Sequence, residues 1–171
     1  HYRNGDPVPN VTDNTEFKNL TTGAFCNYDN NATNADTYGR LYNWWVVNDS
    51  RNVCPAGWHV PTYDELTTIA TFLGDFNIAG GKLKEAGTTH WNSPNTGADN
   101  SSGFTALPGG FRDSQGLYFW LKDIGYWWSA SYMPNFNPPT PMYWYMNSNF
   151  EGVNRSAFSE RLGISIRCIK D

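Results

Sequence analysis

Cysteine has the most varied chemistry of the residue types in this chain, because a thiol can form a disulfide, bind a metal or attack a substrate. The 171-residue sequence has three cysteines, Cys26, Cys54 and Cys168. An odd number allows at most one disulfide within the chain and leaves at least one thiol. The alternative is that all three are small buried apolar residues in a reducing compartment. The spacing of the cysteines leaves both interpretations open.

A loop rich in side-chain oxygens follows Cys26. Asp29, Asn31, Thr33 and Asp36 lie close together in sequence, and calcium prefers carboxylate, amide and hydroxyl oxygens. The segment lacks the glycine and the closing glutamate of a helix-loop-helix calcium site. The two interpretations are a calcium site and an Asx-rich surface loop, and we expect the loop. We therefore expect no bound metal or cofactor.

A lone histidine and scattered carboxylates are the remaining candidates for catalysis. His90 has no second metal-binding residue at ligand spacing, so we expect a hydrogen-bonded loop residue. Asp113 with Asp123 or Glu151 would be the glycosidase-like pair to consider, but nothing in the sequence singles it out. The sequence contains no nucleophile elbow, phosphate-binding loop, dinucleotide fingerprint or zinc-protease helix. We therefore expect that the protein is not an enzyme.

The charge balance argues against nucleic acid as a partner. The net charge is −4, and no block of Lys and Arg overrides that average. No apolar run approaches the about 18 residues that a membrane-spanning helix needs, so we expect no membrane span. The chain begins at His1 without a methionine or a signal-peptide pattern. We expect a mature or excised fragment, with any signal or anchor upstream.

Aromatic and polar residues alternate near the C-terminus, in the composition of a recognition surface. In residues 134–159, Tyr and Trp offer contact area at small entropic cost, while Asn and Ser offer adaptable hydrogen bonds. Phe150 and Phe158 lie where no apolar period would bury them. The alternative is a solvated loop over an aromatic core, and exposure of these two rings distinguishes the alternatives. The predicted ligand-binding residues are Tyr143, Tyr145, Asn147, Asn149, Phe150, Glu151, Arg155 and Phe158.

Helices are predicted in the first half of the chain. Thr62 and Glu65 form a capping box, and apolar residues then recur at helical spacing from Leu66 to Leu73, where Gly74 offers a stop. A second helix is predicted over residues 38–47. The polar, turn-rich residues 1–23 are expected to wrap the domain as an extended segment. The length fits a single domain spanning residues 1–171.

Strands are predicted in the second half. Residues 142–146 alternate, so Tyr143 and Tyr145 share one face while Met142, Trp144 and Met146 share the other, and we expect one of these two faces to be core. Further strands are predicted at residues 104–107, 117–121, 126–131 and 163–169, with turns at residues 108–110 and 114–116. The sequence therefore predicts an α+β domain with two early helices and a twisted, mainly antiparallel sheet.

Seven motifs spread over nearly the whole chain carry a resemblance to a known family. They are residues 38–44, 54–62, 80–84, 87–97, 103–110, 126–129 and 167–168. Together they resemble the Fibrobacter succinogenes major paralogous domain. Within them, residues 60–66 also resemble the Leu-Pro-Thr-Glu-Ala-Glu-Trp signature of the formylglycine-generating enzyme family, whose fold is a variant of the C-type lectin fold.

The lectin-like resemblance implies a single C-type lectin-like domain and a particular disulfide. Such folds bring the start of the capped helix against the C-terminal strand, which implies a bond between Cys54 and Cys168. The formylglycine-generating enzymes use two cysteines in the later part of the domain to bind copper and oxidise a thiol. No cysteine lies between Cys54 and Cys168 here, so that activity is not expected.

A third resemblance concerns residues 143–160, followed by a closing strand at residues 163–168. Diversity-generating retroelement variable proteins, which also have lectin-like folds, vary a similar stretch before a constant final strand. The resemblance implies an adhesin-like recognition domain, secreted or on a bacterial cell surface, that binds a cell-surface protein or glycan. The alternative is a structural module of a bacterial surface protein with no ligand of its own.

Overall fold

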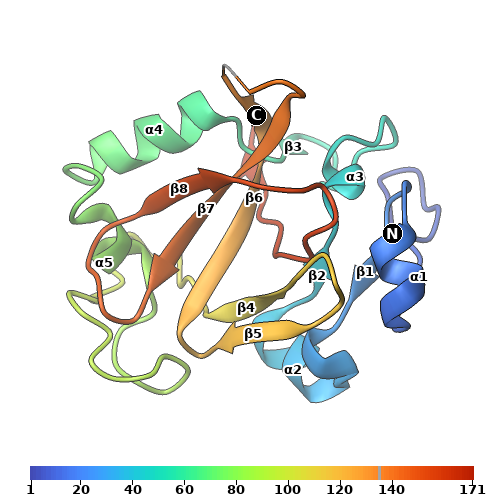
Figure 1. The fold of residues 1–171 in the computed structure, drawn as a ribbon. Coiled ribbons are helices and arrows are strands. Elements are labelled where there is room, and N and C mark those ends of the chain that lie inside the picture. Colours follow the sequence, from blue (N-terminus) through green and yellow to red (C-terminus); the bar gives the residue numbers. More distant parts are fainter. Residues whose placement is uncertain (135) are drawn as a thin grey trace.

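The computed structural model describes residues 1–134 and 136–171, in which short helices surround a curled sheet (Figure 1). The main sheet has five strands in the order β5-β4-β6-β7-β8. They are β4 (Gly109–Arg112), β5 (Tyr118–Leu121), β6 (Ile124–Met133), β7 (Thr140–Asn147) and β8 (Asn154–Ala157). Every pairing is antiparallel except that of β4 with β6. The predicted α+β class with a mainly antiparallel sheet is confirmed.

A small two-stranded sheet joins the middle of the chain to its C-terminal end. Strand β3 (Trp58–His59) pairs with β9 (Ile169–Lys170). Next to this pair, Cys54 and Cys168 form a disulfide with their Cα atoms 5.9 Å apart. Cys26 is a buried free thiol. The pairing implied by the lectin-like resemblance is confirmed, and the interpretation with three thiols is wrong.

Helix α4 (Tyr63–Phe72) begins where the capping box predicts. The Glu65 amide donates to the Thr62 hydroxyl at 3.3 Å, and the Thr62 amide donates to the Glu65 carboxylate at 2.8 Å. Leu66 and Ile69 point toward a core that contains buried Leu73. Helix α5 (Ala79–Leu83) extends this layer. Both helices cover one face of β6 and β7 (Figure 1).

The helix predicted over residues 38–47 is wrong, because the chain turns twice there. Helix α2 (Ala32–Tyr38) ends at Gly39, whose positive φ of 81° suits glycine. Strand β2 (Leu41–Tyr42) then pairs with β1 (Phe25–Cys26), and α3 (Trp44–Val47) follows. The buried Asn43 side chain separates β2 from α3, because it binds the Ala24 amide at 3.0 Å and the Thr22 carbonyl at 2.9 Å.

The N-terminal segment is not extended throughout. Helix α1 (Asn14–Asn19) interrupts it, and the Asp13 side chain caps this helix by accepting from the Glu16 amide at 2.8 Å. Phe17 of this helix and Tyr2 near the terminus are buried. A 3-10 turn, η1 (Tyr28–Asn30), follows β1. Residues 1–23 therefore pack against the rest of the chain through apolar side chains and a helix.

Two strand predictions differ from the structure. Residues 104–107 form only an isolated bridge, between Ala106 and Lys84. The strand β4 begins later, at Gly109, within the segment where a turn was expected at residues 108–110. Residues 163–169 form separate bridges to Arg112, Tyr42 and Trp127 before reaching β9. The closing segment is therefore a strap across several elements. The predicted turn at residues 114–116 is confirmed, since it connects β4 to β5.

The two faces of β6 and β7 carry different aromatic residues. Trp127 and Trp144 lie on the inner face and pack with buried Trp91 and the α4–α5 layer. The predicted alternation in β7 is confirmed, because Met142, Trp144 and Met146 are all buried. Tyr143 and Tyr145 lie on the other face and are only half-buried. Among residues 1–134 and 136–171, no helix is long and apolar enough to cross a membrane.

Candidate ligand-binding face

A row of aromatic rings crosses four strands on the side of the sheet away from α4 and α5. We call Phe111, Phe119, Tyr126, Tyr143 and Tyr145 the outer aromatic face. The ring centroids of Phe119 and Phe111 are 5.6 Å apart, and those of Phe111 and Tyr126 are 5.1 Å apart. Tyr126 then lies 5.8 Å from Tyr143 and 5.7 Å from Tyr145. These spacings are typical of favourable aromatic pairs, so the row is continuous from β5 to β7.

The hairpin and the sheet register place these rings together. Phe111 of β4 lies opposite Phe119 of β5, and Tyr126 of β6 lies opposite Tyr145 of β7. Directly opposed side chains on one face are close enough for ring contact. At Gly110 a Cβ would collide with the Phe119 carbonyl, and φ there is 63°. Gly110 therefore permits the close approach of β4 and β5 that aligns the two phenyl rings.

A groove of about 290 Å³ lies along this face. Its lining residues include Phe111, Tyr126 and Tyr143, together with Asp113 and Phe158. Phe158 is 53% exposed. Asp113 uses Oδ1 to accept from the Gln115 and Leu117 amides, each at 2.8 Å. Its Oδ2 accepts no hydrogen bond from the described residues and is an acceptor available to a ligand.

The three tyrosine hydroxyls of this face are also available. Within the described ranges, no protein group exchanges a hydrogen bond with the hydroxyl of Tyr126, Tyr143 or Tyr145, and none of these oxygens is buried. Burial and the neighbouring Tyr143 and Tyr145 raise the pKa of Tyr126, so its hydroxyl keeps its proton and can donate. The face thus combines apolar rings with hydroxyl donors and a carboxylate acceptor.

The predicted ligand-binding residues do not form one surface. Tyr143, Tyr145 and Phe158 belong to the outer aromatic face or its rim. Arg155 lies on the opposite side of the sheet, where its guanidinium is 4.7 Å from the Phe76 ring centroid and 5.4 Å from that of Tyr63. The remaining four lie at the end of β7 and in the loop after it; they are Asn147, Asn149, Phe150 and Glu151. Residue 135, within the predicted binding region, lies outside the described residues.

The loop after β7 is organised by a buried lysine. Lys84 is fully buried, and its ammonium donates to the carbonyls of Thr96 at 2.9 Å, Asn147 at 3.1 Å and Phe150 at 2.9 Å. Burial lowers the pKa of Lys84 to about 8, and the nearby Glu151 carboxylate opposes that shift. The loop carbonyls therefore surround a cation that belongs to the protein. Phe150 is 38% exposed and Phe158 is 53% exposed, so both of the rings whose exposure distinguishes a recognition surface from a loop over a core are accessible.

The other chemical candidates have structural partners. His90 Nδ1 lies 2.8 Å from Glu85 Oε1, which confirms a hydrogen-bonded loop residue. Asn31 caps α2 by accepting from the Thr33 amide at 2.9 Å. Asp123 accepts from the Asn92 amide group at 2.8 Å. The described part of the chain contains no group of three or more His, Cys, Asp or Glu residues placed to hold a metal ion.

Sequence reasoning missed Phe111, Phe119, Tyr126 and Asp113 as members of the site, and it missed Lys84 as an anchor. A signal for the first two was present, because the turn at residues 114–116 pairs the residues on either side of it. No local pattern distinguishes Lys84, since the carbonyls that surround it come from residues 96, 147 and 150.

Comparison with known proteins places the chain in one family. The model of the Fibrobacter succinogenes major domain matches residues 1–170. Neither the curated proteins nor the solved structures provide a match. Because the family model spans nearly all of the sequence, the chain belongs to the Fibrobacter succinogenes major domain family.

Proposed function

We propose that this chain is a non-catalytic recognition domain that binds its ligand on the outer aromatic face. The observation that carries the proposal is the continuous row of rings across β5, β4, β6 and β7, open along a groove of about 290 Å³. Monomeric soluble proteins seldom expose contiguous apolar surface without a use for it. Phe119 at the β5 end of the row is 38% exposed and Phe158 beside the groove is 53% exposed, so both rings are accessible.

The chemistry of the face favours a glycan. Aromatic rings stack against the apolar faces of sugar rings, while the hydroxyls of Tyr143 and Tyr145 and Oδ2 of Asp113 are suited to hydrogen bonds with sugar hydroxyls. The second candidate is a cell-surface protein, because tyrosines at the centre of a contact are also frequent hot spots. It is favoured by Phe158, whose exposed ring could enter a partner's pocket.

The cellular setting is part of the proposal. A disulfide between Cys54 and Cys168 is typical of an oxidising compartment, which supports a secreted or bacterial surface protein. The bond and the pairing of β3 with β9 also support a C-type lectin-like fold, in which the start of the capped helix lies against the C-terminal strand. Tyr143, Tyr145 and Phe158 fall within residues 143–160, the stretch that would be diversified in a retroelement variable protein.

The test is an array of glycans and surface proteins probed with the purified domain. The parent is compared with a Phe119→Ala/Phe158→Ala variant and with Phe72→Ala as the matched control, since Phe72 is 87% exposed but lies on α4. We expect the double variant to lose at least about tenfold in affinity, while the control binds like the parent. Binding by neither parent nor control would favour a structural module. Binding that survives in the double variant would place the site elsewhere.

A further inference from the structure

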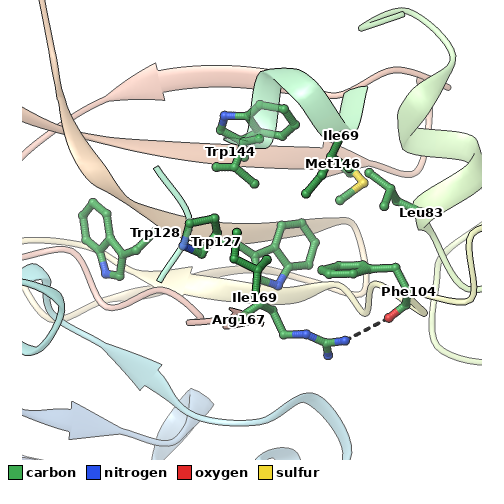
Figure 2. A pocket seen from close by; sticks show the side chains of 11 residues that line it. Ile69, Leu83, Phe104, Trp127, Trp128, Trp144, Met146, Arg167 and Ile169 are labelled. Carbon is green, nitrogen blue, oxygen red and sulfur yellow. Dashed lines mark hydrogen bonds between the residues drawn. The ribbon is translucent and has the colours of Figure 1, made fainter. Parts of the chain in front are cut away.

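A second hollow lies on the inner side of the sheet and is closed by apolar side chains. It has a volume of about 50 Å³ between α4, α5, the inner face of β6–β7 and β9 (Figure 2). Its walls include Leu66, Ile69, Leu83 and Trp127, and almost none of the surface is polar. Water enters a cavity only where polar partners hold it. This apolar chamber therefore favours a hydrocarbon group over water.

The size of the apolar chamber limits what it can hold. A water-sized group needs ~10–15 Å³ on the same scale, so the chamber accepts about three to five carbon atoms. A short or branched alkyl group fits, and a long acyl chain does not.

A cation stands at the edge of the apolar chamber. Arg167 lines it, and Nη2 of this residue donates to the Phe104 carbonyl at 2.9 Å, the bond drawn as a dashed line in Figure 2. The guanidinium lies 4.5 Å from the Phe104 ring centroid. It forms no ion pair with any described residue, and its other N–H groups have no acceptor there. Arginine has five N–H donors in a planar fork that matches a carboxylate.

A wider polar hollow of about 300 Å³, which we call the vestibule, lies next to the apolar chamber, because Trp127 and Arg167 line both. Arg40 lines this vestibule as well, with Tyr38 and Ser165. No described aspartate or glutamate lines either hollow. In a chain with a net charge of −4, this is a local excess of positive charge. The carboxylate of Glu85 is near enough to raise the pKa of the Tyr38 hydroxyl, but it does not line the vestibule and is already hydrogen-bonded to His90.

We propose that the apolar chamber and the vestibule bind a short amphipathic carboxylate. A branched alkyl group of about three to five carbons fills the apolar chamber, and its carboxylate accepts hydrogen bonds from Arg167, with Arg40 as a second positive charge. Trp127 lines both parts of the site. This site lies on the opposite side of the sheet from the outer aromatic face, so its ligand is separate from the one proposed there.

The first experiment titrates the parent domain with sodium 4-methylpentanoate and follows side-chain signals by NMR. We expect saturable shifts at the Trp127 indole and at the Leu83 and Ile69 methyl groups, at millimolar ligand or below. The neutral 4-methylpentanamide should bind at least about tenfold more weakly, because it carries no charge. No saturable shift with the acid would overturn the proposal, as would equal binding of acid and amide.

Two variants separate the head-group and tail contacts. Arg167→Gln should weaken acid binding at least about tenfold, whereas Arg161→Gln, an exposed arginine outside both hollows, should leave it unchanged. Ile69→Phe should abolish binding by filling the apolar chamber. Equal loss in both arginine variants would contradict the assignment of Arg167. If Arg167→Gln fails to fold by near-UV circular dichroism, the acid–amide comparison in the parent still decides the head-group claim.

A further pair of ligands identifies the source of the carboxylate. N-acetylleucine has the carbon skeleton of 4-methylpentanoate and adds an amide group, so it resembles the C-terminal residue of a peptide. The unsubstituted 4-methylpentanoate resembles a small metabolite. Tighter binding of N-acetylleucine would identify a peptide C-terminus as the ligand. Tighter binding of the free acid would identify a small metabolite. Failure of both would contradict the proposed site while leaving the outer aromatic face untouched.

Discussion

The two faces of β6 and β7 are both rich in aromatic residues, yet they differ in what surrounds the rings. On the inner face, Trp127 and Trp144 are covered by α4, α5 and Trp91. On the outer face, Tyr126, Tyr143 and Tyr145 contact one another and keep their hydroxyls accessible. Tyrosine combines an apolar ring with a polar end and suits a surface that is partly wet. The inner rings are therefore covered as core, whereas the outer rings, although Tyr126 and Tyr143 also pack against buried Trp128, keep hydroxyls available for binding.

The largest effect should follow from truncation on the inner face. Trp144→Ala should lower the free energy of unfolding by about 3–5 kcal/mol, the usual loss for a large buried aromatic residue. Trp144→Phe should cost far less, because it also removes a buried indole N–H that has no acceptor among the described residues. Urea unfolding followed by tryptophan fluorescence measures both. A loss no larger than that of Tyr145→Ala would contradict the contrast between the faces.

The disulfide should have the next largest effect, because it anchors the closing segment, residues 163–169, to the rest of the fold. Cys54 and Cys168 are separated by 114 positions in the sequence. Cys54→Ala/Cys168→Ala should lower the free energy of unfolding by about 2–5 kcal/mol. Dithiothreitol should lower the thermal midpoint of the parent and leave that of the variant unchanged. Equal midpoints for the reduced and oxidised parent would show that the bond contributes nothing.

Lys84 tests whether the loop after β7 is structural or belongs to the binding face. Lys84→Met would leave the carbonyls of Thr96, Asn147 and Phe150 without their donor, at a cost of about 1–3 kcal/mol. Hydrogen exchange should accelerate in residues 147–151, while the outer aromatic face keeps its ligand. Loss of binding without a change in hydrogen exchange would assign the loop to the site.

The smallest effect concerns His59, which joins α4 to the C-terminal end. Its Nδ1 lies 2.6 Å from Asp171 Oδ1 and its Nε2 lies 2.8 Å from Glu65 Oε1. The hydrogen bonds with Asp171, and then with Glu65, raise the pKa of His59. Its stabilisation is therefore complete below the unfolded pKa of about 6.5 and is lost as pH rises through the raised folded value.

His59→Gln should remove that pH dependence. The groups are partly exposed, so the difference from the parent should be about 1 kcal/mol or less at low pH. It should disappear at alkaline pH, in thermal unfolding scans recorded across the range. A difference that grows with pH would contradict the protonated arrangement.

Local signals predicted the parts of the fold that depend on neighbouring residues. Thr62 and Glu65 predicted the start of α4, and alternation in β7 predicted which side chains share a face, one of which is core. The helix expected over residues 38–47 was wrong because Asn43 binds backbone groups of Thr22 and Ala24, which lie far back in sequence. Local periodicity contains no information about such partners.

The candidate site was predictable to a similar degree. Composition identified Tyr143, Tyr145 and Phe158, which lie on or beside the outer aromatic face. Phe111 and Tyr126 join them only through the sheet order, in which β4 pairs in parallel with β6. A parallel pairing of this kind leaves no local pattern in the sequence, because β5 separates the two paired strands along the chain.

The most direct test of the outer aromatic face is the affinity for the array-selected ligand, measured by calorimetry for the parent, Phe119→Ala/Phe158→Ala and Phe72→Ala. We expect parent-like affinity for Phe72→Ala and a loss of at least about tenfold for the double variant, with all three proteins equally stable within about 0.5 kcal/mol. Unchanged affinity in the double variant would contradict the assignment of this face as the binding site.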